Sequence, residues 1–252
     1  CVYSCSKYSL EVNKALKMAG DNKGELIKVL EYYKNQNSKE KLEAAKFLIS
    51  NLPYNYAYDT INLYKYNIVY KTYDSINNLD KKINSYAFIN KFWDSLKLYE
   101  DPNKNIYYKP VMEDIKTIKS DFLINNIDLA YNSWKTNPYA RDSVSFDDFC
   151  EYILPYRHVQ GKAIENWRDF FTKNNQNHFK DSYPIPFTKA CDSLFIQYKD
   201  YKFDYWIAQN LPILKFKDFM KMKRGNCAIK SWFNTYVVNA EGIPMVTDFV
   251  PA

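Results

Sequence analysis

The chain has 252 residues, of which 46% are hydrophobic and 25% charged, with a formal net charge of +6 at pH 7. This length and composition suit a folded chain with a substantial core, which excludes wholesale disorder, and no apolar run is long enough to span a bilayer. Lysines alternate with acidic residues and form no basic block, which argues against nucleic acid as a partner.

The first residues have the pattern of a lipid attachment site. The chain begins Cys1-Val2-Tyr3-Ser4-Cys5, and a small residue before a cysteine resembles a bacterial lipobox. Either Cys5 receives the lipid and residues 1–5 include a signal-peptide remnant, or Cys1 is itself the processed terminus. Both interpretations predict anchoring to a membrane in the bacterial cell envelope, periplasmic or surface-exposed. The alternative is an arbitrary fragment start with two incidental cysteines.

Residues 6–105 have the periodicity of a helical region. Asn22 and Glu25 have capping-box spacing, and apolar residues follow on one helix face. Ser38 suits the next N-cap, and Leu52-Pro53 ends that helix. Further helices are expected at about 60–72 and over a longer stretch from about 76 to 96, followed by a break at 101–103. The sequence predicts a helical bundle, or a helical cap on the rest of the chain.

A second series of elements occupies residues 106–252. A helix is expected over 121–134, and Ser145 and Asp148 form a cap-like pair before a helix that Pro155 stops. The remaining expected elements are helices over 163–171, 188–198 and 212–222, with a polar loop over 173–186.

The last stretch, 224–252, carries the most specific pattern. Apolar residues recur at helical spacing from Ala228 to Ala240, Gly242 suits a helix end with positive φ, and Pro244 prevents continuation. Residues 245–250 form a short apolar run with β-branched members, which predicts a buried strand. The pattern therefore places Cys227 in the first turn of a buried helix.

That position suits a reactive thiol. Unpaired N–H groups and the positive end of the dipole favour an anion at a helix start, and the thiolate is the nucleophilic form of cysteine. Gly225 removes side-chain bulk before Cys227, and Asn226 is placed to cap the helix. The alternative is a free cysteine used as a small core residue.

The segment Gly225-Asn226-Cys227, its apolar helix, and Gly242-Ile243-Pro244 resemble the core motif of the transglutaminase-like superfamily. The following strand is similar to that of transglutaminase-like lipoproteins from Bacteroides-type bacteria. Residues 149–157 and 165–168 resemble other segments of the same family. The resemblance implies that Cys227 is the nucleophile and that the substrate is a protein or peptide. We expect no metal and no cofactor.

The sequence departs from this family after the strand. The family completes its site with a His and then an Asp downstream of the cysteine helix, but this sequence has no His after Cys227 and ends at Ala252. Its two histidines, His158 and His178, both precede Cys227. His158 remains a candidate base, because catalytic groups are defined by geometry and not by chain order.

The other candidate groups are less specific. Cys150 and Cys191 lie on apolar helical faces and are expected in the core, with a disulfide between them left open. No cysteine spacing suggests zinc. Asp147, Asp148 and Glu151 suit a carboxylate pair for acid–base work, or simply a solvated helix start.

Together these patterns predict a mostly helical α+β protein. Residues 1–5 form the anchor region, 6–105 the helical region, and 106–252 an incomplete transglutaminase-like (papain-like cysteine enzyme) core. We expect a cysteine acyl-transfer or amide-hydrolase protein, inactive as given because the downstream His and Asp are absent. The alternative is a non-catalytic surface lipoprotein that binds peptide or glycan. The truncated core predicts an exposed apolar edge at residues 245–250.

Overall fold

The computed structural model describes residues 8–59, 67, 71, 111–175, 178–203 and 215–247. This part of the chain is mostly helical, with two small two-stranded sheets, so the predicted helical α+β class is confirmed at that level. The lipidation candidates Cys1 and Cys5 lie outside the described residues, as does most of the stretch predicted to be helical between 60 and 105. Within that stretch, Asn67 and Lys71 are helical.

The helices follow one another along the chain as α1 (Leu10–Met18), η1 (Gly20–Asn22), α2 (Lys23–Asn35), α3 (Lys39–Asn51), η2 (Leu52–Tyr54), α7 (Asp114–Thr117), α8 (Ser120–Thr136), α9 (Phe146–Asp148), η4 (Phe149–Ile153), α10 (Trp167–Asn174), α11 (His178–Ser182), α12 (Phe187–Ile196), α13 (Phe216–Met222) and α14 (Cys227–Ala240). The short helix η4 is a π-helix. The strands are β1 (Tyr56–Tyr58), β2 (Val111–Glu113), β3 (Lys202–Phe203) and β4 (Arg224–Gly225).

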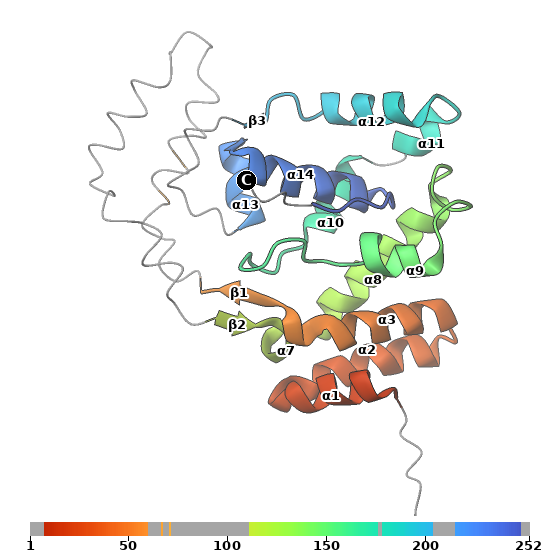
Figure 1. The fold of residues 1–252 in the computed structure, drawn as a ribbon, viewed down its shortest axis with the longest axis vertical. Coiled ribbons are helices and arrows are strands. Elements are labelled where there is room, and N and C mark those ends of the chain that lie inside the picture. The colour runs from red at the N-terminus through yellow and green to blue at the C-terminus, as the bar shows by residue number, and fades with distance from the viewer. Residues whose placement is uncertain are drawn as a thin grey trace, which may run out of the picture.

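The helices stack along the long axis of the molecule. In Figure 1, α1, α2 and α3 lie at one end and α11 and α12 at the other, with α8, α10 and α14 between them. One continuous cluster of buried apolar side chains runs through these layers, from Val12 in α1 to Ile243 after α14. No helix in the described ranges has the length and apolar character needed to cross a membrane.

The N-terminal helices are joined to α8 by polar contacts as well as by apolar packing. The hydroxyl of the fully buried Tyr33 lies 3.0 Å from the Ile124 carbonyl oxygen and 3.1 Å from Asp128 Oδ1. Glu25 Oε2 accepts hydrogen bonds from the backbone N–H and the hydroxyl of Ser120, at 2.9 and 2.8 Å, and so caps α8. The two predicted regions therefore share one interior.

The predicted capping box at the start of α2 is wrong. The Asn22 side chain makes no cap hydrogen bond and instead donates to the carbonyls of Ile115 and Ile118, at 3.1 and 2.9 Å. Glu25 is engaged by α8. Both side chains have the right spacing for a local cap but satisfy more distant backbone groups, and η1 leads directly into α2.

The chain between α9 and α12 also differs from the prediction. Residues 163–166 are not helical, and Glu165 accepts hydrogen bonds from the backbone N–H groups of Phe216 and Lys217 at the start of α13. The stretch predicted as a loop, 173–186, contains the end of α10 and all of α11.

The cap formed by Ser145 is confirmed, since its hydroxyl accepts from the Asp148 N–H at 3.1 Å.

Two short sheets connect segments that are distant in sequence. Strands β1 and β2 pair antiparallel, with Ala57 opposite Met112, and β3 and β4 pair parallel, with Phe203 opposite Gly225. Gly161 forms an isolated parallel bridge with Ala57 on β1. Strands of two or three residues give too little alternation to be recognised in the sequence.

The end of α14 is built as the sequence predicts. Gly242 has φ +77°, and the N–H groups of Gly242 and Ile243 donate to the carbonyls of Asn239 and Val238. A Cβ at Gly242 would lie 2.4 Å from the backbone nitrogen of Trp134, so α14 and α8 approach closely here.

The described part of the predicted final strand, residues 245–247, is not a strand. It runs back along α14 and is held by side chains of that helix: Asn239 Nδ2 donates to the Met245 carbonyl at 3.2 Å, and the hydroxyls of Thr235 and Thr247 lie 3.0 Å apart. Val246 is 54% exposed. Residues 248–250 lie outside the described chain.

Candidate functional site

The turn before α14 is fixed by both of its neighbours. Helix α13 ends at Lys223, whose backbone is left-handed with φ +52°. The next two residues form β4 and pair with β3, and the Lys202 N–H donates to the Lys223 carbonyl at 2.9 Å. Asn226 then starts α14 with an extended backbone, so the chain reverses between a helix, a strand and a second helix.

The predicted cap of α14 is present. Asn226 Oδ1 accepts from the Ile229 N–H at 3.0 Å, which satisfies one of the four orphan N–H groups at the helix start. No residue of the described ranges accepts a hydrogen bond from the N–H of Cys227 or of Ala228. Two backbone donors therefore remain beside the thiol at the positive end of the helix dipole.

Cys227 is a free, solvent-exposed thiol. Ala228 is exposed as well, so the predicted buried face of this helix does not include it and starts at Ile229. From Trp232 to Ala240 the helix is buried almost throughout. Helix α14 is thus anchored in the core by its later turns and presents its first turn to solvent.

Gly225 is required by packing within the turn itself. A Cβ at this position would lie 2.6 Å from Ile229 Cγ2, closer than real Cβ atoms approach one another. The space left by this glycine is therefore filled by the side chain of Ile229, and its absence of bulk lets α14 begin directly after β4.

The structure does not bring His158 to Cys227. His158 Nε2 lies 3.0 Å from Asn239 Nδ2, and its ring contacts Tyr236 with centroids 5.4 Å apart. Tyr236 and Asn239 follow Cys227 by nine and twelve residues, which is about 14 and 18 Å along a helix axis. Burial lowers the pKa of His158 to about 3, with the nearby Arg168 contributing. His158 is thus a neutral, half-buried ring packed against α14.

His178 is held by α12. Its Nε2 lies 2.9 Å from the Ala190 carbonyl oxygen and 3.1 Å from Ser193 Oγ, and its Nδ1 lies 3.1 Å from Gln197 Nε2. Both ring nitrogens are therefore occupied in fastening α11 to α12.

Buried Arg168 ties the end of η4 to α14. It donates to the carbonyls of Ile153, Pro155 and Asn239 at 2.7, 3.2 and 2.7 Å, and to Asn126 Oδ1 at 2.9 Å. The three carbonyl acceptors lie at or near the C-terminal ends of η4 and α14, where a cation is favoured. Burial lowers the pKa of Arg168 to about 9.

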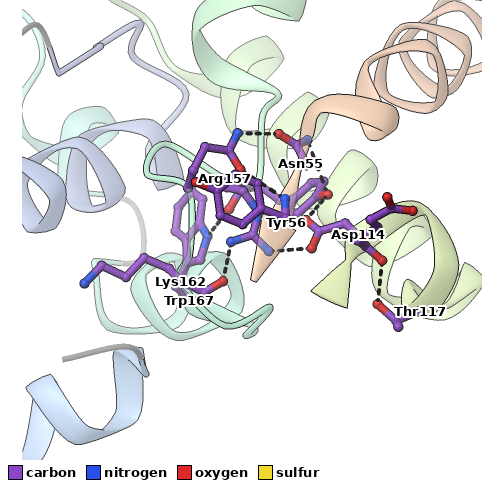
Figure 2. Close-up of polar contacts among 10 residues, drawn as sticks. Asn55, Tyr56, Asp114, Thr117, Arg157, Lys162 and Trp167 are labelled. Atoms are coloured by element: carbon purple, nitrogen blue, oxygen red, sulfur yellow. Dashed lines mark hydrogen bonds and ion pairs between the residues drawn. The ribbon is translucent and has the colours of Figure 1, made fainter. Parts of the chain in front are cut away.

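A buried ion pair holds the loop between η4 and α10. Arg157 donates to the Asp114 carboxylate through Nε at 2.7 Å and Nη2 at 2.8 Å, and the Tyr156 hydroxyl donates to Asp114 Oδ2 at 2.7 Å. Arg157 also donates to the Lys162 carbonyl. Figure 2 shows the guanidinium between these two acceptors. No local sequence signal pairs Asp114 with Arg157, which lie 43 residues apart.

The same loop is linked to α14 through stacked rings. Trp167 Nε1 donates to the Tyr156 carbonyl at 2.8 Å, and its ring stacks on Tyr236 with centroids 3.9 Å apart and an interplanar angle of 3°. The two segments that resembled one family, 149–157 and 165–168, therefore meet at the buried face of α14. Their observed contacts are structural.

The side chain of Lys162 extends from this loop towards α14. In Figure 2 its amine points away from the Arg157–Asp114 pair, and Nζ lies 5.3 Å from the centroid of the Trp232 ring. Burial lowers the pKa of Lys162 to about 8. Sequence reasoning missed this residue, because one lysine among many carries no local mark.

The remaining candidate residues show no feature of a catalytic group. Cys150 is buried and Cys191 half-buried, and both are free, so the disulfide that was left open is not formed here. Asp147 and Asp148 in α9 and Glu151 in η4 are exposed, as expected for a solvated helix start. Within the described ranges, no cluster of His, Cys, Asp and Glu is arranged to hold a metal ion.

Comparison with known proteins gives no relative: no family model, no curated protein and no solved structure matches this chain. The site is therefore interpreted from its own geometry, together with the motif resemblance around Cys227.

Proposed function

We propose that this chain carries the nucleophile of a cysteine acyl-transfer or amide-hydrolase protein of the transglutaminase-like kind, acting on a protein or peptide. The observation that carries the proposal is Cys227, an exposed free thiol in the first turn of a capped 14-residue helix. The finer fold assignment, an incomplete transglutaminase-like core, belongs to the same proposal.

The proposed reaction uses the local geometry of this turn. The Cys227 thiolate attacks a carboxamide carbon, the S–C bond forms, and the carbonyl oxygen takes up the negative charge. The free N–H groups of Cys227 and Ala228 are the donors available to stabilise it. The C–N bond then breaks, the amine leaves with a proton taken up from solvent, and water or another amine resolves the thioester.

Acylation and turnover are separable in this proposal. Proton transfer to a leaving amine needs a general acid. A phenolate leaving group needs no such proton. We therefore expect an activated ester to report the acylation of Cys227 independently of amide turnover.

The test is acylation by p-nitrophenyl acetate, followed by intact-protein and peptide mass spectrometry. The thiolate displaces p-nitrophenolate, and the thiol proton goes to solvent. We expect acetylation of Cys227, and not of Cys150, in the wild type and in a Cys191→Ala control, and no acetylation of residue 227 in Cys227→Ala. Acetylation spread over lysines, with Cys227 unmodified, would overturn the proposal.

The position of His158 favours a second candidate. Since His158 is held about 14 to 18 Å along α14 from Cys227, it is not placed to serve as a base. A non-catalytic surface lipoprotein that binds peptide or glycan is consistent with this arrangement. The same experiment separates the candidates, because a binding protein needs no acylation of Cys227.

A further inference from the structure

A cavity of about 340 Å³ opens beside the first half of α14. Its walls come from α12, from the turn that follows α12, and from α14. The lining residues are Phe195, Tyr198, Tyr201, Lys230, Phe233 and Asn234. A volume of this size lies at the lower end of the range for small-ligand pockets.

The cavity has an ordered aromatic wall. Tyr201 stacks on Phe233 with centroids 5.0 Å apart at 24°, and Tyr198 meets Phe233 edge-on at 5.3 Å and 81°. The Tyr198 hydroxyl is fixed by donating to Asn175 Oδ1. Flat ring faces and edges held in this way suit an aromatic group, which stacks or packs edge-on against them.

Two polar groups at the cavity have no partner in the described ranges of the chain: the Asn234 amide and the Tyr201 hydroxyl. Burial raises the pKa of Tyr201 to about 12, so its hydroxyl remains a neutral hydrogen-bond donor. Apolar walls with a few polar groups are typical of sites that bind an organic side chain and fix its orientation.

The cavity lies on the same side of α14 as Cys227. Lys230 and Asn234 follow Cys227 by three and seven residues, which places them on one stripe of the helix, about 4.5 and 10.5 Å along its axis. A peptide whose carbonyl carbon is held at the thiol therefore reaches the cavity with a neighbouring side chain.

We propose that this cavity is a specificity subsite, which binds an aromatic side chain of a peptide substrate adjacent to the acyl group attacked by Cys227. The inference rests on the proposed function and adds the class of substrate. Its physical basis is the aromatic wall together with the spacing of Cys227, Lys230 and Asn234 along α14.

The test compares two chloroacetamides with the same electrophile: N-phenethyl chloroacetamide and N-methyl chloroacetamide. In both, the thiolate attacks the CH₂ carbon, the C–Cl bond breaks, chloride leaves, and the thiol proton goes to solvent. Rates at Cys227 are measured by peptide mass spectrometry and divided by the rates of free glutathione. We expect the aromatic reagent to react about tenfold faster at Cys227, as roughly 1.4 kcal/mol of subsite binding gives.

Two variants on α12 distinguish an effect of the cavity wall from a general effect on this helix. Phe195→Ala removes part of the wall and should abolish the aromatic preference, whereas Ile196→Ala, on the same helix at a side chain 64% exposed, should retain it. Circular dichroism checks that both variants are folded. Equal corrected rates for the two reagents in the wild type overturn the subsite and leave the nucleophile standing. A Cys227 that reacts with neither reagent overturns the proposed function, and the subsite with it.

Discussion

At the scale of single residues, burial shifts the pKa values of two ionisable groups beside α14 in opposite directions. His158 has its pKa lowered to about 3, and Glu241, at the C-terminal end of α14, has its pKa raised to about 8. Each shift is caused mainly by removal from water, which disfavours the charged form. Each therefore makes folding depend on pH, over different ranges.

We predict that His158 makes the fold less stable in acid. Its folded pKa lies below the ordinary value of 6.5, so between pH 6.5 and 3 the unfolded chain binds the proton that the folded chain excludes. Stability is complete above pH 6.5 and should fall by about 2 kcal/mol at pH 5. Urea unfolding of the wild type and of His158→Gln at pH 7.5 and 5 measures this. An equal loss in both proteins would contradict the assignment.

Glu241 should act in the opposite direction. Its folded pKa lies above the ordinary value of 4.5, so between pH 4.5 and 8 the folded chain keeps a proton that the unfolded chain has lost. Stability from this group falls as pH rises through that range. Because Glu241 is partly exposed, we expect Glu241→Gln to be more stable than the wild type by roughly 1–2 kcal/mol at pH 8, and about equal to it near pH 4.5. Thermal unfolding at the two pH values provides the comparison.

At the scale of elements, α14 depends on how it ends. Gly242→Ala should destabilise the protein by about 2 kcal/mol or more, because the new Cβ requires a strained positive φ and meets the Trp134 backbone. Gly24→Ala is the matched control, since that glycine lies within α2 with nothing within 4 Å of its added Cβ. It should stabilise by about 0.5–1 kcal/mol. Denaturant midpoints that shift equally for both variants would contradict this account.

The same element marks how far the sequence could predict the structure. The Asn226 cap, the apolar face from Ile229 and the Gly242 end of α14 are local signals, and all three are present. Asn22 and Glu25 gave an equally good local signal, yet their side chains are used by α7 and α8. A helix cap can be predicted from the sequence when no group from a distant part of the chain forms hydrogen bonds with the capping side chain.

The cavity beside α14 and the start of α10 depend on distant parts of the chain. Glu165 leaves the predicted helix to accept hydrogen bonds at the start of α13, 51 residues on. The aromatic wall joins Tyr201, the residue before β3, to Phe233 in α14, and β3 is itself paired with the distant β4. Neither arrangement has a local period, so the sequence predicted the place of Cys227 at the start of a helix and not the surroundings of that helix.

At the scale of the whole molecule, the pair formed by Asp114 and Arg157 joins the N-terminal layers to the loop behind α14. Both side chains are at most 2% exposed. Asp114→Ala leaves a buried guanidinium without its carboxylate and should cost about 3–5 kcal/mol. Asp142→Ala, which breaks the exposed pair with Arg141, is the control and should change stability by less than about 1 kcal/mol.

The double variant Asp114→Leu with Arg157→Met completes this prediction. Replacing both charges by apolar groups removes the unpaired ion, so the double variant should recover most of the loss. Calorimetry of the four proteins measures the unfolding free energies. A double variant as unstable as Asp114→Ala would mean that the hydrogen bonds to Tyr156 and to the Lys162 carbonyl, and not the charge pairing, fix this region.

The most direct test of the account is a timed alkylation of the whole chain by limiting iodoacetamide, with each cysteine followed by peptide mass spectrometry. Cys227 is exposed, whereas burial raises the pKa of Cys191 to about 11 and that of Cys150 to about 12, which suppresses their thiolates. We predict that, among the three cysteines in the described part of the chain, Cys227 is alkylated first, Cys191 later and Cys150 last. A Cys227 alkylated no faster than Cys191 would contradict the central claim that the turn before α14 presents a reactive nucleophile.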